Sequence, residues 1–307
     1  MSKKKSLILF EVPELPWDVL HLYVQDHPNS NLARLLNQSA RANVISEPDE
    51  QELRYWVTSA TMYRGVSQSV HGLRFLNQKE TLQHPPLWVT LAQQGLSVGV
   101  FGASYSHVWK DEVPEQTLFY VPEKFAPDNW TKPQRAVTHQ RFLRVMSRLT
   151  DQGHGKISAR VRGSIAVAHF LLSKARRLHM GVLIDLFRRW GFSLFQQHRT
   201  LLRARLVYSA FTRLHEKYRP DFSILTSGTI GTALHLSLAS YLQAHERQST
   251  GAETLLGQAL DELDSEVGSL MAVAEREQST LVLASGYGQS PTEEMQFLAG
   301  LTKSLDQ

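Results

Sequence analysis

The sequence predicts an α/β protein: a doubly wound, mostly parallel β-sheet flanked by helices, with a helical insert. Residues Leu7–Val12 form an apolar run interrupted only at Glu11, which is typical of a strand buried on both faces. A second such run lies at Ser279–Ser285. Helix and strand patterns alternate between them, as in Pro85–Gly95 followed by Ser97–Gly102, and this alternation is the building pattern of a doubly wound sheet.

The part of the chain before residue 150 carries several start and stop signals for helices. Asn29–Asn31 supplies cap residues ahead of an apolar-periodic segment. Pro85 and Gly95 bracket another helix with the usual asymmetry of Pro at the start and Gly at the end. The elements expected here are helices at Trp17–Tyr23, Asn31–Leu36, Leu53–Tyr63, Pro85–Gly95 and Val137–Leu149, strands at Ala42–Ser46, Ser97–Gly102 and Thr117–Val121, and a turn at Ser67–Gly72.

The chain changes character from Ile165 to Tyr218. This stretch has no Pro and only two Gly, and its apolar residues recur at helical spacing, which indicates two or three helices. The later elements expected are a strand at Pro220–Thr226, helices at Thr229–Ala244 and Thr254–Glu275, a fully buried strand at Ser279–Ser285 and a loop at Gly286–Gln289. We therefore expect three parts: residues 1–150 as the first part of the α/β domain, 151–219 as a basic helical insert or cap, and 220–307 as the second part of the domain.

Composition excludes several classes of protein. The chain has 307 residues, enough for a large core, and no Cys, so it has no disulfide framework, no thiolate metal site and no Cys nucleophile. The basic start is followed by an apolar run too short for a signal peptide, and no segment offers the roughly 18 apolar residues of a membrane span. We expect a cytoplasmic protein.

Positive charge is concentrated in one segment. Residues 160–219 hold 13 Lys and Arg against only Asp185 and Glu216, although the net charge of the whole chain is +4. Such a segment is either a solvated helix face or a surface that docks on an anionic membrane or an acidic glycan, because Trp and Phe are interleaved with the basic residues. Nucleic acid is not expected as a partner, since no nucleic-acid-binding motif is present. Docking on the inner membrane surface would make the protein peripheral.

A few polar side chains stand where a site would form. Glu11 and Glu14 follow the first strand, at the sheet edge where ligands of such folds bind, and they are either site residues or acids that favour the start of the next helix. His235 lies on an otherwise apolar helix and is either a core residue or part of a site. Ser285 and Gln289 follow the last strand and bind either a ligand or loop backbone groups.

Several motifs occur together in a fixed order. They are Glu11-Val12-Pro13-Glu14-Leu15-Pro16-Trp17-Asp18, Arg64-Gly65 with His71-Gly72, the segment Pro85 to Val100, Pro220-Asp221 with His235, and Ser285-Gly286-Tyr287-Gly288. In this order and spacing the chain resembles the alkaline phosphatase superfamily, and within it the type I phosphodiesterase/nucleotide pyrophosphatase-like branch. The resemblance covers about residues 6–125 and 220–300 and leaves out the basic middle.

The resemblance implies a two-metal site that this sequence does not match. Members of the branch hold two metal ions, usually zinc, with Asp and His near a Thr or Ser nucleophile. Here the first Asp falls on Pro13 or Glu14, the nucleophile near Tyr55, a later Asp on Gly231, and the final Asp-His on Gly286-Tyr287. Only His235 stands at a ligand position. We therefore expect no metal cofactor, zinc being disfavoured, and a degenerate phosphodiesterase.

The residues expected to matter follow from this comparison. Glu11, Glu14 and His235 are the candidate catalytic residues, and the candidate ligand-binding residues are Tyr55, Arg64, His71, Ser285 and Gln289. Ser285-Gly286-Tyr287-Gly288-Gln289 also resembles a subgroup whose members accompany bacterial surface-polysaccharide genes. The sequence thus suggests an accessory protein that binds a phosphorylated or glycan small molecule. The alternatives are an active metal-independent hydrolase or transferase and a peripheral membrane scaffold.

Overall fold

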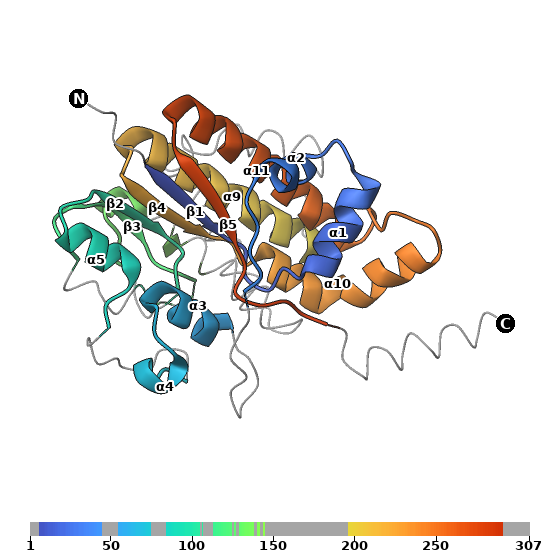
Figure 1. The fold of residues 1–307 in the computed structure, drawn as a ribbon, viewed down its shortest axis with the longest axis horizontal. Helices are drawn as coiled ribbons and strands as arrows, with labels where there is room; N and C mark the ends of the chain where they lie inside the picture. The colour runs from blue at the N-terminus through green and yellow to red at the C-terminus, as the bar shows by residue number, and fades with distance from the viewer. Residues whose placement is uncertain are drawn as a thin grey trace.

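A single parallel sheet organises the computed structural model of the chain (Figure 1). The structure describes residues 6–44, 55–74, 84–104, 106, 113–124, 126, 129–137, 140–141, 144 and 196–290, without the side chains of Tyr55 and 196–199. The strands are β1 (Leu7–Glu11), β2 (Val98–Phe101), β3 (Thr117–Val121), β4 (Phe222–Thr226) and β5 (Thr280–Ala284). Within the described residues their order is β3-β2-β4-β1-β5, and every pairing is parallel.

Helices alternate with these strands, so the predicted α/β fold is confirmed. The helices are α1 (Trp17–Asp26), α2 (Asn31–Gln38), α3 (Tyr55–Arg64), α4 (Gln68–His71), α5 (Leu87–Gln93), the 3-10 turn η2 (Gln134–Ala136), α9 (Gln196–Tyr218), α10 (Thr229–Glu246) and α11 (Leu255–Glu277). Two of them begin at side-chain caps: Ser30 accepts a hydrogen bond from the N–H of Ala33, and Thr254 accepts one from Gly257.

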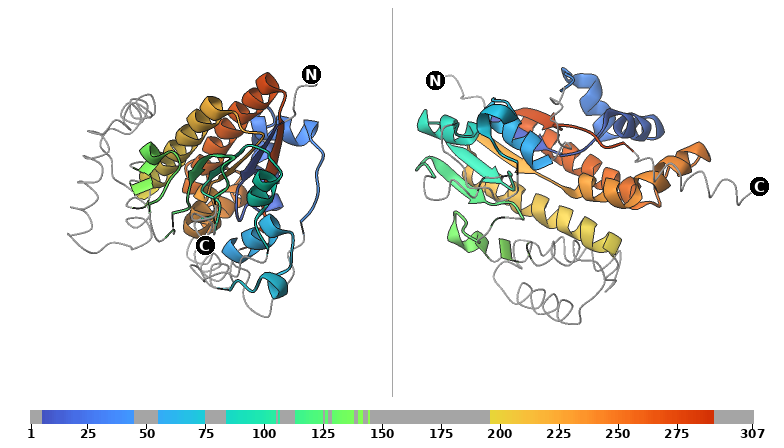
Figure 2. Two further views of the ribbon diagram at one scale, coloured as in Figure 1. Left: turned by 90° about the vertical axis from the view of Figure 1, so that its left-hand side faces the viewer. Right: turned by 90° about the horizontal axis from the view of Figure 1, so that it is seen from below.

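Both faces of the sheet are covered, as Figure 2 shows, with α9, α10 and α11 on one side and α5 on the other. Alternate residues of a strand point to opposite faces. Phe10 and Leu225 join the large core cluster with the long helices, whereas Ile224 and Val100 pack with Trp88 of α5. Burial on both sides explains why β1, β2 and β4 read as nearly continuous apolar runs.

β1 lies inside the described sheet, between β4 and the edge strand β5. Leu7 pairs with Phe222 on one side and with Thr280 on the other, and the pairing continues in register to Glu11. Because all strands are parallel, Glu11, Thr226 and Ala284 end at the same edge of the sheet. Glu11, at the end of β1, therefore lies at the carboxyl edge of the sheet, where ligands of such folds bind.

Three local predictions are wrong. The strand at 279–285 is not fully buried: β5 pairs only with β1 among the described residues, and Thr280 and Val282 are exposed. Of the strand expected at Ala42–Ser46, the described residues Ala42–Val44 are irregular and exposed, and no described strand pairs with them. The turn expected at Ser67–Gly72 contains a one-turn helix, α4, which Gly72 ends in the left-handed conformation (φ 66°).

Part of the chain lies outside the description. Of the helix expected at Val137–Leu149, residues 137, 140, 141 and 144 are described and are helical, and the other residues fall outside, as does most of the basic insert, up to residue 195. The last stretch of the insert is α9, which confirms its helical character from Gln196 to Tyr218. Among the helices that are described, none has the length and apolarity needed to cross a membrane.

Candidate functional site

Two acidic residues flank the exit of β1, and the structure gives them different surroundings. Glu11 is the last residue of the strand and is 1% exposed. Glu14 follows in the loop and adopts a left-handed backbone (φ 71°), which is uncommon for a residue with a side chain. The two carboxylates therefore have different local surroundings, although the sequence presents them as a pair.

Glu11 is held by three hydroxyl groups. Ser59 donates to its Oε1 at 2.6 Å, Thr226 donates to its Oε2 at 2.7 Å, and the hydroxyl of Tyr63 also donates to Oε2. Burial raises the pKa of Glu11, and the three hydrogen bonds oppose that rise. Glu11 thus links β1 to β4 and α3 through these hydrogen bonds, and both of its carboxylate oxygens take part in them.

Glu14 lies in a second cluster, with His235 and Gln289. Its Oε2 is 3.2 Å from Nε2 of His235 and accepts a hydrogen bond from the side-chain amide of Gln289. The Gln289 amide nitrogen is also 2.9 Å from the same imidazole nitrogen. Three candidate residues from β1, α10 and the segment after β5 therefore meet at the carboxyl edge of the sheet.

The cluster has one member that faces solvent. The side chain of His235 is 65% exposed, whereas that of Glu14 is 9% exposed. The hydrogen bond to Glu14 raises the pKa of His235, and the charge of Glu14 adds to this, while desolvation and Lys124 act in the opposite direction. A ligand in solution therefore meets the imidazole, with the carboxylate behind it.

Nε2 of His235 has two possible partners, and its protonation selects between them. In the imidazolium form Nε2 carries a proton and donates to Glu14. In the neutral form with the proton on Nδ1, Nε2 accepts from the amide of Gln289. The cluster can therefore hold or release a proton at this atom without leaving it unpaired.

Gly231 makes room for this arrangement. A Cβ at position 231 would lie 2.9 Å from Cδ of Glu14 and 3.0–3.1 Å from its two oxygens. Gly231 lies one helical turn before His235 on α10, so the helix backbone passes directly against the carboxylate. The Glu14 side chain occupies the space that a side chain at 231 would need.

The loop after β5 is shaped by close contacts. A Cβ at Gly286 would approach the side chain of Thr58 at 2.8 Å, and one at Gly288 would approach Pro16 at 2.6 Å. Ser285 donates its hydroxyl to the carbonyl of Tyr287 at 2.9 Å, so it satisfies the loop backbone. These contacts shape the loop between β5 and Gln289.

Two other candidates form contacts around α3 and α4. Nδ1 of His71 accepts from the N–H of Leu73 at 3.1 Å, so Nε2 carries the proton and donates to Oγ1 of Thr61 at 2.9 Å. Burial lowers the pKa of His71 to about 4, with Arg64 and His84 contributing, so the ring is neutral at pH 7. Arg64 donates to the carbonyl of His84 at 2.8 Å. The side chain of Tyr55 lies outside the described residues.

The structure contains a Ser-His-acid arrangement that sequence reasoning missed. Nδ1 of His215 is 3.1 Å from Oγ of Ser223, and its Nε2 is 3.0 Å from Oε2 of Glu277. Ser223 is completely buried and His215 is 2% exposed, so no substrate reaches the hydroxyl. These three residues connect α9, β4 and α11, and no local motif in the sequence marks them.

The described side chains at the sheet edge do not fit the two-zinc centre that the resemblance implies. Zinc sites in proteins use at least three nitrogen, oxygen or sulfur ligands for each ion. Around Glu14 there is one carboxylate and one imidazole, and Glu11 is engaged by hydroxyl donors. Across the described residues, no three His, Asp or Glu side chains are grouped so that they could hold a metal ion.

Two arginines of the basic segment point into the molecule. Arg203 is 6% exposed and donates to Oγ1 of Thr232 at 3.0 Å. Arg205 binds Oε2 of Glu262 with two nitrogens, each at 2.7 Å. These two charges belong to the contacts of α9 with α10 and α11, which a solvated helix face would not predict.

Comparison with known proteins places the chain in a family. No curated protein and no solved structure matches the sequence. The family model described as type I phosphodiesterase / nucleotide pyrophosphatase matches residues 40–305, which is most of the chain and includes β2–β5 and His235. Together with the parallel sheet and its flanking helices, this match shows that the chain belongs to the type I phosphodiesterase / nucleotide pyrophosphatase family of the alkaline phosphatase superfamily.

Proposed function

We propose that this family member is catalytically degenerate and binds a phosphorylated or glycan-type small molecule without zinc, as an accessory protein of bacterial surface-polysaccharide metabolism in the cytoplasm. The observation that carries the proposal is the meeting of Glu14, His235 and Gln289 at the carboxyl edge of the sheet. The polysaccharide context comes from the resemblance of Ser285–Gln289 to a subgroup, and it is an association rather than a mechanism.

The chemistry of the cluster favours an anionic ligand. The exposed imidazole of His235 carries a positive charge when protonated, and the adjacent carboxylate of Glu14 favours that form by raising the pKa of the imidazole. Lys124, in the loop after β3, adds a second positive charge that acts on the same imidazole and lowers its pKa. A phosphate oxygen can accept a charge-assisted hydrogen bond from His235, which is roughly twice as strong as a neutral one.

A binding titration tests the proposal. Inorganic phosphate, a phosphate diester and an uncharged oligosaccharide are titrated into metal-free protein, and the His235 ring signals are followed by NMR. We expect the phosphate compounds to shift the His235 signals and His235→Ala to weaken binding at least tenfold. His21→Ala, which removes an exposed imidazole on α1, is the matched control and leaves affinity unchanged. Equal affinity in wild type and His235→Ala would rule out this site.

A second candidate function is metal-independent hydrolysis or group transfer at the same cluster. The 3.2 Å contact of Glu14 with His235 favours it, because a carboxylate and an imidazole that share a proton can serve as general base and general acid. Turnover of a phosphodiester or glycan should then vanish in both Glu14→Gln and His235→Ala. If the wild type binds the ligand but does not turn it over, the result supports the accessory protein and contradicts the enzyme.

A peripheral membrane role of residues 160–219 is a further proposal, supported by the charge of that segment. Arg203 and Arg205 are engaged inside the molecule, so the docking surface would have to come from the other basic residues of the segment. Pelleting with anionic vesicles at low and high salt tests this. Replacing Arg188 and Arg189 with Gln should reduce pelleting, whereas vesicles of neutral lipid should not bind the wild type.

A further inference from the structure

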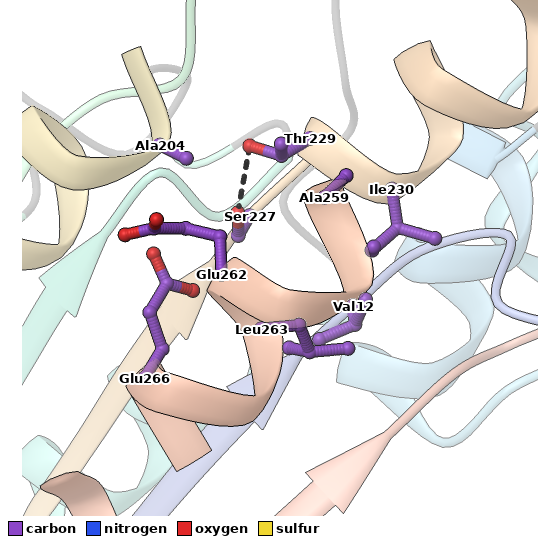
Figure 3. A pocket seen from close by; sticks show the side chains of 9 residues that line it. All are labelled: Val12, Ala204, Ser227, Thr229, Ile230, Ala259, Glu262, Leu263 and Glu266. Carbon is purple, nitrogen blue, oxygen red and sulfur yellow. Dashed lines mark hydrogen bonds between the residues drawn. The ribbon is translucent and has the colours of Figure 1, made fainter. Parts of the chain in front are cut away.

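A small cavity lies among α9, α10 and α11, and neither Glu14 nor His235 lines it (Figure 3). The volume open to the centre of a water-sized sphere is about 10 Å³, which is the space of about one water molecule. The lining residues are Val12, Ala204, Ser227, Thr229, Ile230, Ala259, Glu262, Leu263 and Glu266. Figure 3 shows the carboxyl groups of Glu262 and Glu266 turned toward each other at one side of this cavity.

Glu266 is the unusual member of the lining. It is 5% exposed, and its buried Oε1 has no hydrogen-bond partner among the residues that the structure describes. Buried polar groups in proteins are nearly always hydrogen-bonded, and a buried charge is normally paired or bound to a metal. An ionised Glu266 would be both a buried charge and a buried group with an unpaired oxygen, which these two rules disfavour. A neutral carboxyl group carries no charge and can donate a hydrogen bond, so its burial costs less free energy.

Arg205, a cation beside the pair, is bound to Glu262. Arg205 directs two nitrogens, each at 2.7 Å, to Oε2 of Glu262. With both carboxylates ionised, one guanidinium would face two negative charges in a buried setting. Burial is the main cause that raises the pKa of Glu266, the charge of Glu262 adds to it, and Arg205 only partly offsets the two.

We propose that Glu266 is a buried proton-binding site that locks α9 onto α10 and α11. With the proton bound, the cavity holds one net ion pair, Arg205 with Glu262, and a neutral carboxyl group. Loss of the proton to solvent leaves the carboxylate of Glu266 opposite that of Glu262. Water then has to enter the cavity to solvate the new charge, and α9 loosens from its partners because it forms the wall that carries Ala204 and Arg205.

The groups that face Glu266 come from every surrounding element. α9 contributes Arg205 and Tyr208, whose own pKa Glu266 helps to raise. α11 contributes Glu262, and the junction of β4 with α10 contributes only the hydroxyls of Ser227 and Thr229. Glu266 is therefore the group whose protonation controls the charge of this junction below the alkaline range in which tyrosine ionises.

Infrared spectroscopy tests the bound proton directly. At pH 7 the wild type should show the carbonyl stretch of a protonated, buried carboxyl group, and Glu266→Gln should lack it. Glu253→Gln removes an exposed acid just before α11 and serves as the matched control that keeps the band. The wild-type band can be read without any variant, so its absence at pH 7 overturns the proposal even if the Gln variant fails to fold.

Hydrogen exchange tests whether the proton on Glu266 keeps α9 packed against α10 and α11. As the pH is raised from 7 to the point where the infrared band of the protonated carboxyl group is lost, we expect amides of α9 in the wild type to lose protection relative to the same amides in Glu266→Gln, because the amide side chain cannot ionise. Amides of α5, on the other face of the sheet, should show no difference between the two proteins. Equal protection of the α9 amides in wild type and variant across this range would overturn the proposed role of Glu266 in holding α9. It would not bear on the proposed ligand site.

Discussion

The contact between Glu14 and His235 determines how the candidate site behaves as a function of pH. His235 has a pKa raised above its ordinary value of 6.5, chiefly by its hydrogen bond to Glu14. A histidine with a raised folded-state pKa stabilises the fold fully below the unfolded pKa, and this contribution disappears as the pH rises through the folded pKa. The contact thus favours both the fold and the charged imidazole on the acidic side of neutrality.

Replacing Glu14 with Gln should lower the pKa of His235 toward 6.5. The substitution keeps the shape of the side chain but removes the charge that favours imidazolium. An NMR titration of the His235 ring in both proteins measures the difference, with the buried His71, whose pKa is about 4, as an internal reference. An unchanged pKa for His235 would mean that the two side chains do not interact in solution.

Glu11 should matter for stability more than for binding. Glu11→Gln places an amide group opposite hydroxyls that now donate to a carboxylate, and we expect a loss of about 2 kcal/mol in the free energy of unfolding. Tyr63→Phe, which removes one donor, should cost about 1 kcal/mol. Urea unfolding measures both, and a loss of ligand affinity without a loss of stability would assign Glu11 to the site instead.

At the scale of single elements, the long helix α11 depends on its first turn. Thr254 accepts a hydrogen bond from the N–H of Gly257, and α11 packs against α9, α10, α2 and β5. Thr254→Ala should therefore lower the free energy of unfolding by about 1 kcal/mol, while Thr254→Ser keeps the cap and costs less. Chemical denaturation of the three proteins measures the difference, and equal midpoints would show that the cap does not contribute.

The elements with strong periodicity could be predicted from the sequence. Strands β1, β2 and β4 are apolar because helices cover both of their faces, and α5, α10 and α11 carry clear start signals or long apolar faces. β5 has the same composition as these strands but lies at the edge of the described sheet. The composition of a segment predicts whether it forms a strand, but it does not predict which strands or helices will lie beside it.

The candidate site could be predicted only residue by residue. Glu14, His235 and Gln289 each stood out, yet their contact depends on the strand order that brings β4 and β5 to either side of β1. The hydroxyls of Ser59 and Tyr63 are four residues apart on one helix, a spacing too common to indicate a carboxylate partner. His215 with Ser223 and Glu277 was missed because three separate elements supply the residues.

At the scale of the whole molecule, the fold should not depend on a metal ion. The described residues offer no group of three His, Asp or Glu that could bind one, and a metal that binds only the native state would raise the melting temperature. We expect EDTA treatment to leave the melting temperature unchanged and zinc to restore nothing. Metal analysis after dialysis is the companion measurement, and two tightly bound zinc ions per chain would contradict the prediction.

The packing of Glu14 against Gly231 couples these two positions. A Cβ at 231 would lie 2.9 Å from the carboxyl carbon of Glu14, so a side chain at 231 and Glu14 in its present position compete for the same space. A larger residue at 231 would therefore displace the Glu14 side chain from its contact with His235, and its effect on the cluster depends on which residue stands at position 14.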